Sequence, residues 1–587
     1  MRFSMSLVIS GLLAATLIMP VSSTTYFVDP AAGNDGNAGT SQSAAWQHVP
    51  GSYRSDNGGF LSAARWAVLR GGDTVRIKSG TTISNRLFIS TSWYTGSGVK
   101  NPIVIMRDLS WGSGAVVMNG SGVSLGTWDA LVTELTGGVV IDGAIADGLI
   151  IQNSPAEGIM LNGPSETNKN RGNVIRNVKF FNNLSFNVVF QSCDSFTVDN
   201  VEVDGNRQSG GNSGGFYFGG GQYACTNGLV RDCESHHNGA TPGTQEGWTN
   251  ARMGFWITNC QNLSFVNCWA HDNMGRGFDM GEVDPPTVIT DNIKVINCTS
   301  SNNFAGFGCN LQDMSGTSRF YFINCIADHN VMGFDVYEGP SAYIYNCLMA
   351  YNGWGIYFDA PRYSLRTTSM TVKNSVFYKN SRSGSPGVDL YLYRVEGMGS
   401  LVLDYNHYEF GGQSAATSWN PGVVYDPYGY SAAQAPGSTT RSWYVNHRQD
   451  PHSLCSVDNL LARFTDETNY RLSSNSCLIG RGTPITDIPE AAFDRDGKRR
   501  SSTWDIGPYA VSSGGPTAAL PKMGRQPTRA ALNAVDARTF SALGQHQGTI
   551  SRSRDVNPGH NRSGFAPGVG IVVPDDKSKA SIRPSIR

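Results

Sequence analysis

The chain has few charged residues, and its positive and negative charges nearly cancel. Asp, Glu, Lys and Arg make up 16% of the 587 residues, and the formal net charge is −1. A nucleic-acid-binding protein shows an excess of basic residues, so this balance argues against that class. Apolar runs are also short, and after residue 23 none is long enough to cross a bilayer. We expect neither a nucleic-acid partner nor a later membrane span.

Glycine, by contrast, is abundant at 69 residues, and 40% of the chain is hydrophobic. This composition favours a turn-rich β protein over a helical one. Short segments such as "YFINCIADHN" and "AYIYNCLMA" are rich in β-branched and aromatic residues and are closed by Gly or Asn. That pattern is typical of strands separated by turns.

The first 23 residues resemble an export signal. Arg2 gives a positive start, Leu7–Met19 is apolar, and Val21–Ser23 offers small residues for cleavage. A membrane anchor is the alternative, but the apolar run is short for a bilayer span. We expect cleavage near Ser23 and a secreted or extracytoplasmic protein.

Eight segments of the chain fit one repeating frame, in which a small or apolar anchor residue is followed five residues later by Asn. The anchors are Val178, Val201, Cys233, Cys268, Cys298, Cys325, Cys347 and Ser375. The corresponding Asn residues are Asn183, Asn206, Asn238, Asn273, Asn303, Asn330, Asn352 and Asn380. Successive anchors lie 22 to 35 residues apart, and self-similarity at such a period indicates a solenoid.

Short strands with a small residue and Asn at the corners predict an all-β fold, a right-handed parallel β-helix. Stacked Asn side chains can hydrogen-bond from coil to coil at one corner. Leucine-rich repeats and propellers are rivals, but the Leu framework and the Trp-Asp pairs are missing. The expected organisation is a signal peptide (1–23), an N-terminal cap with the first coils (24–135), the repeats (136–410), a closing segment (411–511) and a disordered basic tail (512–587).

Eleven cysteines in an exported protein normally suggest a disulfide framework. Here the number is odd, and nine of them lie between Cys193 and Cys347, mostly at the repeat spacing. We therefore expect buried, reduced core residues. Cys455 and Cys477 stand apart, and the sequence leaves open whether they form a bridge.

Both flanks of the repeats contain phrases that resemble a known family. "TTYFVDPAAGNDGNAGTSQSAAWQHVPG", "GGDTVRIKSGTT" and "NPIVIMRD" resemble the opening of secreted right-handed β-helix proteins related to family-nine pectate lyases. "NYRLSSNSCLIGRGTP" and "DRDGKRRSSTWDIGPYA" resemble the segment that closes many such helices. The resemblance covers about Thr25–Val511 and implies the fold. In that family a lysine base acts beside an aspartate cluster that holds calcium.

After the Asn corner, each coil reads Gly, apolar, X, apolar, and strand alternation points X outward. The outward residues form one predicted stripe: Tyr217, Trp256, Asp279, Gly308, Asp335, Tyr357 and Asp389. Asp359, two residues after Tyr357, is expected on the same face. Asp is disfavoured in strands, so its recurrence beside Tyr and Trp favours a sugar-binding or catalytic groove over a merely solvated face.

The acids of the stripe are the candidate catalytic residues. Asp279 and Asp335 lie two coils apart, and their side chains can reach the carboxylate separation of an inverting glycosidase, about 6.5–9.5 Å. Asp359, on the coil after Asp335, is a third candidate. Glu282 and Glu338 follow at a turn and are expected at the rim of the same groove. The predicted substrate-binding residues are Tyr217, Trp256, Tyr357, Arg276, Arg362 and Asp389.

Three functions remain open from the sequence, all with a polysaccharide as partner. A glycoside hydrolase with paired carboxylates needs no cofactor. A uronic-acid polysaccharide lyase requires calcium and a strong base, and the stripe has no lysine, which leaves Arg252, Arg276 or Arg362 for that role. A non-catalytic glycan-binding or adhesin-type surface protein is the third possibility, because fold does not imply function.

Two further motifs point elsewhere. "QDPHS" at Gln449–Ser453 is similar to the Asp-Pro-His-Asp signature of alginate epimerases, but it ends in Ser and follows the repeats. Four histidines lie at or next to the Asn corner, and we expect them to be exposed turn residues rather than a zinc site. They are His236, His237, His271 and His329.

Overall fold

The computed structural model describes most of the chain between Ser23 and Val511. The described residues are 23–54, 59–61, 65–126, 129–165, 168–207, 214–220, 224–244, 252–281, 290–310, 318–337, 339–359, 368–380, 388–393, 398–409, 424–425, 448–456 and 459–511. The chain divides into two units, Met1–Gln526 and Pro527–Arg587, and every described element belongs to the first. The expected export signal (1–23) lies outside the described residues except for Ser23, and the expected basic tail (512–587) lies outside them entirely. Within the described part, no helix is long and apolar enough to span a membrane.

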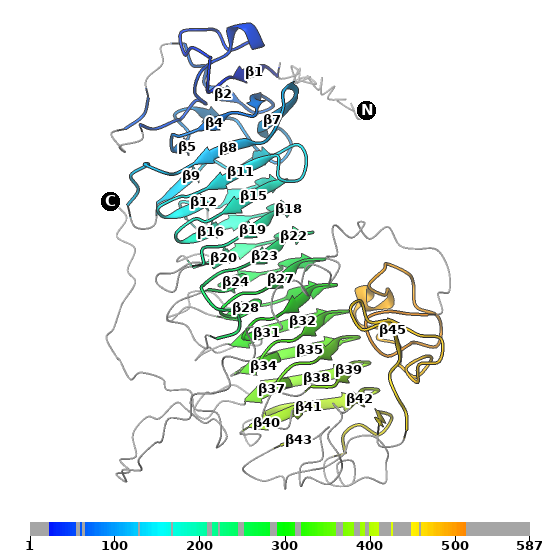
Figure 1. The fold of residues 1–587 in the computed structure, drawn as a ribbon. Coiled ribbons are helices and arrows are strands. Elements are labelled where there is room, and N and C mark those ends of the chain that lie inside the picture. The colour runs from blue at the N-terminus through cyan, green and yellow to red at the C-terminus, as the bar shows by residue number, and fades with distance from the viewer. Residues whose placement is uncertain are drawn as a thin grey trace, which may run out of the picture. The chain divides into compact units, whose positions relative to one another are not determined.

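Three long parallel sheets form the body of this unit, as the stacked arrows of Figure 1 show. Sheet 1 contains β1 (Thr25–Val28), β3 (Thr74–Ser79), β7 (Ile103–Gly112), β10 (Val139–Asp142), β14 (Val174–Arg176), β18 (Thr197–Asp199), β22 (Leu229–Arg231), β26 (Ser264–Val266), β29 (Ile293–Ile296), β32 (Ser318–Ile323), β35 (Pro340–Tyr345), β38 (Thr368–Lys373) and β41 (Met398–Asp404). Each strand pairs in parallel with the corresponding strand of the next coil.

Sheet 2 follows sheet 1 in each coil. It contains β4 (Thr82–Ile83), β8 (Val116–Asn119), β11 (Leu149–Gln152), β15 (Val178–Phe181), β19 (Glu202–Asp204), β23 (Glu234–His236), β27 (Trp269–His271), β30 (Thr299–Ser301), β33 (Ile326–Asp328), β36 (Leu348–Ala350), β39 (Val376–Tyr378), β42 (His407–Glu409) and β44 (Leu454–Cys455).

Sheet 3 completes the coil and carries the predicted stripe. It contains β5 (Leu87–Ile89), β9 (Ala130–Glu134), β12 (Glu157–Asn162), β16 (Phe186–Gln191), β20 (Gly214–Phe218), β24 (Phe255–Thr258), β28 (Phe278–Gly281), β31 (Ala305–Asn310), β34 (Met332–Tyr337), β37 (Trp354–Asp359), β40 (Val388–Tyr393) and β43 (Val424–Tyr425). Parallel strands that repeat through three sheets make this unit a parallel β-helix, as the repeat period predicts.

Smaller elements complete the described fold. A short parallel sheet contains β13 (Asn170–Arg171), β17 (Cys193–Asp194), β21 (Cys225–Thr226) and β25 (Cys260–Gln261). Two strand pairs are β2 (Leu69–Arg70) with β6 (Tyr94–Thr95), and β45 (Phe464–Asp466) with β46 (Arg471–Leu472), and two 3₁₀ helices span Gln42–Ala44 and Pro489–Ala492.

The turn from sheet 1 to sheet 2 needs only one residue in the left-handed region of backbone space. Asn267, Asn297 and Asn324 make this turn with φ of 55°, 56° and 54°. Asn tolerates the region better than most residues because its short side chain can hydrogen-bond locally. The amides also bond between coils, since Asn324 Nδ2 donates to Asn297 Oδ1 at 3.1 Å. This turn explains why "NC" recurs at the anchor of each repeat.

At the corner between sheets 2 and 3, the second repeated Asn forms a buried ladder, which confirms the prediction. Each Nδ2 donates to the Oδ1 of the next Asn, at 2.7, 3.0, 3.4, 3.1 and 3.1 Å along the series Asn238, Asn273, Asn303, Asn330, Asn352 and Asn380. The ladder satisfies amide groups at a bend where sheet hydrogen bonding is interrupted.

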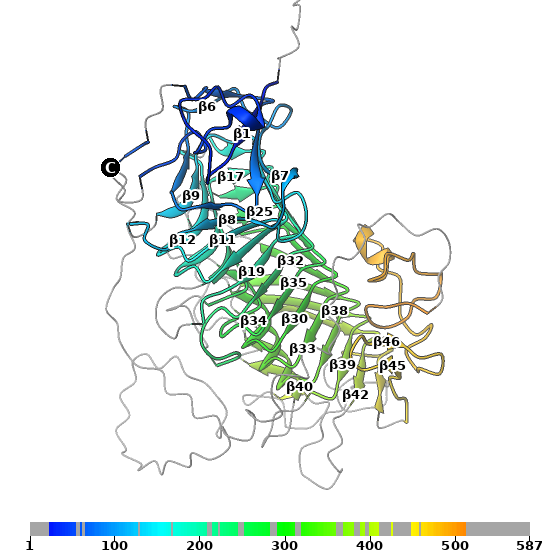
Figure 2. The same ribbon diagram turned by 45° about the horizontal axis from the view of Figure 1, so that its top comes forward.

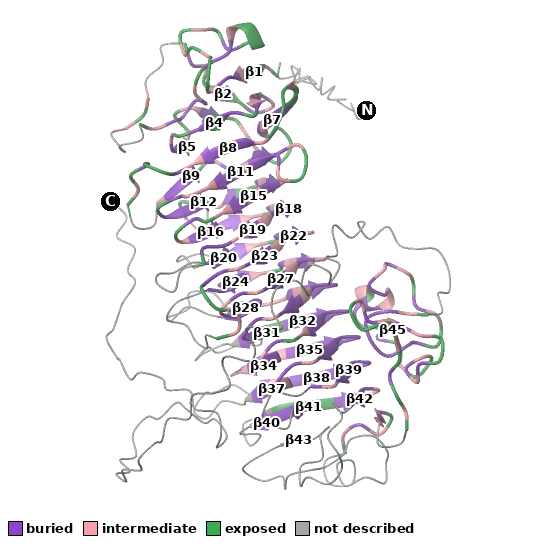
Figure 3. Cartoon of the chain, in the orientation of Figure 1, coloured by how far each residue is buried: buried purple, intermediate pink, exposed green. Residues whose placement is uncertain are grey.

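The core between the sheets consists of stacked side chains, one layer per coil. Phe255, Phe278, Phe307 and Phe334 follow the glycine of the repeat frame, and their ring centroids are 4.6, 5.2 and 4.9 Å apart in succession. Figure 3 shows buried residues, in purple, in the stacked strands of the coils. The apolar residues of the repeat frame therefore face inward, as strand alternation predicts.

The nine repeat cysteines are buried free thiols, as predicted. Cys268 and Cys298, for example, donate to the carbonyl oxygens of Val230 and Phe265 at 3.5 Å. Cys455 and Cys477, which the sequence left as a possible pair, form no disulfide bridge.

Residues 459–511 pack against the outer faces of sheets 1 and 2. An apolar cluster joins Ile485, Ile488 and Trp504 to Ile296, Ile323 and Tyr345 of sheet 1. Arg495 Nη1 donates to the carbonyl oxygens of Cys298 and Asn324, both at 3.0 Å. Figure 2 shows this segment, in orange, beside β38, β39 and β42. The described part of the expected closing segment thus covers a flank of the β-helix.

Replacing Asn303 by Ala should lower the free energy of unfolding by about 3 kcal/mol, because several buried polar groups lose partners, at about 1–3 kcal/mol for each unsatisfied group. Asn303 Nδ2 donates to Ala270 O at 3.0 Å, and its Oδ1 accepts from the backbone N–H and Nδ2 of Asn273, both at 3.0 Å. Urea denaturation measures the change.

Asn292→Gly is the matched control for the ladder. Asn292 Nδ2 donates to Asn262 Oδ1 at 2.7 Å on the surface, and its φ is 54°, which glycine adopts without strain. The control should cost less than about 1 kcal/mol. Equal destabilisation by the two substitutions would show that the buried ladder contributes nothing special.

Candidate functional site

The predicted outward stripe exists on sheet 3, with one correction. Strand register aligns seven residues in one row: Tyr217, Trp256, Asp279, Gly308, Asp335, Tyr357 and Tyr391. The two acids and the glycine between them therefore lie on three successive coils. Tyr391 is a member of the row that the sequence interpretation missed.

Asp389 does not belong to the row, and its predicted place there is wrong. It lies two residues before Tyr391, where other coils have the glycine that contacts the Asn ladder. An added Cβ at Gly355 would be 3.2 Å from Asn380 Nδ2, and Asp389, on the next coil, accepts a hydrogen bond from that Nδ2 at 2.9 Å. Asp389 therefore ends the Asn ladder. Burial raises the pKa of its carboxyl to about 7.

Arg276 joins the two acids of the row. Its Nη2 donates to Asp335 Oδ2 at 2.6 Å, and its Nε lies 3.6 Å from Asp279 Oδ1. One guanidinium thus spans the space between the two carboxylates. The bridged oxygens of Asp279 and Asp335 can therefore be no farther apart than the width of one guanidinium plus these two contacts. This upper limit is compatible with the carboxylate separation of about 6.5–9.5 Å in inverting glycosidases.

The glycine between the acids makes room for this arrangement. A Cβ at Gly308 would lie 2.7 Å from Arg276 Cδ and 3.0 Å from Asp279 Oδ1. Any side chain there would push the arginine out of its position between the carboxylates. The aliphatic arm of Arg276 fills the space that the missing side chain of Gly308 leaves.

The two carboxyl groups have different surroundings. Burial raises the pKa of Asp279 to about 6, while Arg276 lowers it and Asp335 raises it. Neither oxygen of Asp279 accepts a hydrogen bond from the described residues, whereas Asp335 has the short, charge-assisted bond from Arg276. Two acids in unequal environments suit a division into a proton donor and a proton acceptor. All three side chains of this cluster are buried.

Aromatic residues lie on both sides of the cluster along the row. Tyr217 is buried, and its ring stacks on Phe186 at 4.9 Å and on Trp256 at 4.5 Å. Phe186 and Trp256 are themselves only 5.7 Å apart, so the three rings pack as a triangle. Because Tyr217 is buried in this cluster, it supports Trp256 rather than offering its own face to a sugar. On the other side, Tyr357 stacks on Tyr391 at 5.1 Å. Trp256 and Tyr357 are partly exposed.

The remaining predicted site residues cannot be placed as side chains. Glu282, Glu338 and Arg362 lie outside the described residues. The backbone of Asp359 continues β37 two residues after Tyr357, in register with Tyr337 and Tyr393, and nothing more of it is described.

A histidine cluster on sheet 2 differs from expectation. His236 and His271 are buried strand residues rather than exposed turn residues, because they end β23 and β27 and their rings stack on each other at 4.8 Å. His237 and His329 do occupy the turn, with φ of 55° and 57°. The adjacent pair "HH" at the end of a predicted strand was the available sequence signal for this cluster.

Comparison with known proteins bears on the fold. A family model described as a right-handed β-helix region matches residues 134–347. The chain is a right-handed parallel β-helix protein. No curated protein sequence gives a significant match to it.

Three solved structures illustrate what this β-helix is similar to. A pectate lyase, Pel9A, is 17% identical over 84% of this chain and 98% of its own, with a TM-score of 0.45. A rhamnogalacturonan lyase is 17% identical over 62% and 84%, with a TM-score of 0.38. The GH136 lacto-N-biosidase from Eubacterium ramulus is 12% identical over 66% and 64%, with a TM-score of 0.32. The fold class rests on the strand order and the family model rather than on these likenesses.

Proposed function

We propose that this β-helix is a secreted glycoside hydrolase that cleaves a polysaccharide lying along the outward row of sheet 3. The carrying observation is the pair Asp279 and Asp335, bridged by Arg276 on three successive coils. Asp279 acts as the general acid that protonates the glycosidic oxygen, and Asp335 as the base that activates water. This division follows the inverting mechanism, in which one carboxyl group protonates the leaving oxygen and the other activates water, and it requires Arg276 to move from between the acids when substrate binds.

The rest of the row binds the polysaccharide. Trp256 precedes the acids by one coil and Tyr357 follows them by one coil, so partly exposed rings lie on both sides of the cleavage point. Because the reacting cluster is buried, a sugar reaches it only when the surface above the cluster opens on binding. Arg276 keeps both acids in place until then.

The geometry favours hydrolysis over calcium-dependent elimination. In a lyase, a cation between carboxylates neutralises the uronate, and here the guanidinium of Arg276 occupies the space between Asp279 and Asp335. A guanidinium stays protonated in proteins, which makes Arg276 a poor candidate for the strong base of an elimination.

A panel of plant, algal and bacterial polysaccharides tests the proposal. We expect release of reducing sugar without absorbance near 235 nm, the signal of an unsaturated elimination product. After exhaustive chelation, added calcium should leave the rate unchanged. Absorbance near 235 nm would instead establish a lyase, and retention of a polysaccharide without any product would establish a binding protein.

The pH dependence of activity follows from Asp279. A general acid works in its protonated form, so activity is present below its pKa of about 6 and is lost as pH rises through that value. We expect kcat/KM to fall about tenfold per pH unit above about pH 6, as measured on the most rapidly cleaved polysaccharide. An activity that is constant up to pH 8 would remove Asp279 from the role of acid.

A further inference from the structure

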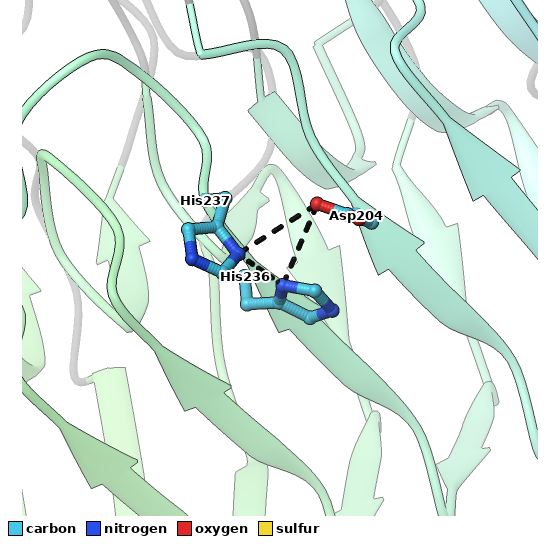
Figure 4. A group of neighbouring side chains, drawn as sticks. All are labelled: Asp204, His236 and His237. Carbon is cyan, nitrogen blue, oxygen red and sulfur yellow. Dashed lines mark hydrogen bonds and ion pairs between the residues drawn. The ribbon is translucent and has the colours of Figure 1, made fainter. Parts of the chain in front are cut away.

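A second cluster of chemically reactive side chains lies on sheet 2, away from the row of sheet 3. Asp204 ends β19, His236 ends β23, and His237 follows His236 at the turn. Parallel register places Asp204 directly beside His236 on the next coil. Figure 4 shows the carboxylate and both imidazole rings converging on one point.

The three potential ligand atoms lie close together. Asp204 Oδ1 is 3.6 Å from His236 Nδ1 and 3.6 Å from His237 Nδ1, and the two Nδ1 atoms are 2.5 Å apart. In tetrahedral zinc sites, bonds of about 2.0–2.2 Å place neighbouring ligand atoms about 3.3 Å apart. The two distances to Asp204 match that value. The two Nδ1 atoms are now hydrogen-bonded to each other, and they need to move apart by less than about 1 Å for an ion to bind between them.

Independent support comes from the far side of the His236 ring. Its Nε2 faces Glu202 Oε1 at 3.4 Å, and that carboxylate also accepts a bond from Lys179 at 2.6 Å. A metal-binding histidine almost always donates its second ring N–H to a carboxylate or carbonyl, which fixes the tautomer that turns the other nitrogen toward the metal.

We propose that Asp204, His236 and His237 form a transition-metal site suited to Zn²⁺, with the remaining coordination completed by water. Two imidazoles and a carboxylate are ligands that zinc and similar first-row metals prefer, whereas calcium takes oxygen ligands.

A neighbouring cluster of Glu234, His236 and His271 has similar spacing but is a poorer site. His271 Nδ1 pairs with Asp272 at 2.7 Å and its Nε2 with Glu234 at 3.0 Å. Both ring nitrogens of His271 already pair with carboxylates, so a metal would have to displace one of these contacts.

Arg207 competes with the ion for Asp204. Its Nη2 lies 2.7 Å from Asp204 Oδ1, and half of its side chain is exposed. Metal binding therefore displaces a surface ion pair, which water screens and which contributes little to stability. Because the site links β19 to β23, occupancy should strengthen the contact between two adjacent coils.

The test uses the full secreted chain, stripped with chelator and titrated with Zn²⁺ by calorimetry. His237→Asn is the main variant, because Asn182 and Asn302 have φ of 52° and 54° at the corresponding turns of other coils. We expect one Zn²⁺ per chain in the parent protein and at least about 100-fold weaker binding in His237→Asn and in Asp204→Asn. Arg207→Ala should bind equally well or more tightly.

His329→Asn is the matched control. His329 occupies the turn position that corresponds to His237, three coils later, with φ of 57°, and it pairs with Asp328. Its removal should therefore leave zinc binding unchanged. Co²⁺ in place of Zn²⁺ should give visible absorption bands of a tetrahedral site that His237→Asn abolishes. Absence of stoichiometric zinc binding by the parent, or its survival in both ligand variants, would overturn the proposal.

Discussion

Replacing Asp335 by Asn should lower kcat on the cleaved polysaccharide about 10³-fold, the size of effect expected for a general acid or base. The substitution keeps the shape of the side chain. It also keeps an oxygen that can accept the hydrogen bond that Arg276 Nη2 now donates to Asp335 Oδ2. It removes the proton acceptor and also the charge that helps to raise the pKa of Asp279. The fold should persist, as circular dichroism and the urea midpoint will show.

The two acids can be told apart by rescue. In Asp335→Asn, added azide should restore turnover, because a small anion replaces the water that the base activates. In Asp279→Asn, azide should have no effect, but aryl glycosides with good leaving groups should be cleaved nearly normally, since they need no acid. A reversed pattern would exchange the two roles.

Asp389→Asn is the control for both variants. Asp389 is also a buried acid with a raised pKa, about 7, but it ends the Asn ladder through Asn380. Asn in its place keeps the accepting oxygen, so activity should change less than about threefold. If Asp335→Asn proved as active as this control, Asp335 would have no part in catalysis.

Replacing Arg276 by Met should lower the free energy of unfolding by about 3–5 kcal/mol at pH 7, because the carboxylates of Asp279 and Asp335 lose their shared positive charge while buried. The guanidinium makes contacts of 2.6 and 3.6 Å with them. The decrease in the free energy of unfolding should be smaller below about pH 5, where protonation removes the negative charges of Asp279 and Asp335. Urea denaturation at pH 7 and pH 4.5 measures both values.

Arg319→Met supplies the comparison for an exposed ion pair. Arg319 Nη2 lies 2.6 Å from Asp291 Oδ2, and 47% of its side chain is exposed. Water screens such a pair, so its loss should cost less than about 1 kcal/mol. If the two arginine variants lost equal stability, burial of the Arg276 cluster would add nothing to the free energy of its ion pairs.

Much of the fold followed from local chemistry that a sequence displays directly. The "NC" anchor and the Asn five residues later predicted coils, because a one-residue left-handed turn favours Asn and because amides can stack from coil to coil. The structure places Asn297 and Asn303 in those two positions. The frame of Gly, apolar, X, apolar also placed Asp279 and Asp335 in one outward row, since strand alternation requires only a count of residues.

The frame failed where a coil departs from the repeat. The coil of Asp389 has no glycine at the corner position of the frame. Counting residues therefore assigned Asp389 to the row, although Tyr391, two residues later, occupies that position. Parallel register with β37 resolves the position. The stacking that covers Tyr217 was equally invisible, because it depends on Phe186 of the preceding coil.

The sequence by itself determined the parallel coil, its Asn ladder, its buried thiols and the outward row of acids and aromatic residues. Each of these features depends on the spacing of residues within one repeat, and that spacing can be read directly from the sequence. Only the tertiary structure decided that Arg276 bridges Asp279 and Asp335 and that Asp204 meets His236 and His237. The contacts of Arg276 with Asp335 and of Asp204 with the two histidines join residues of different coils. Coil lengths of 22 to 35 residues hide this register until the strands pair.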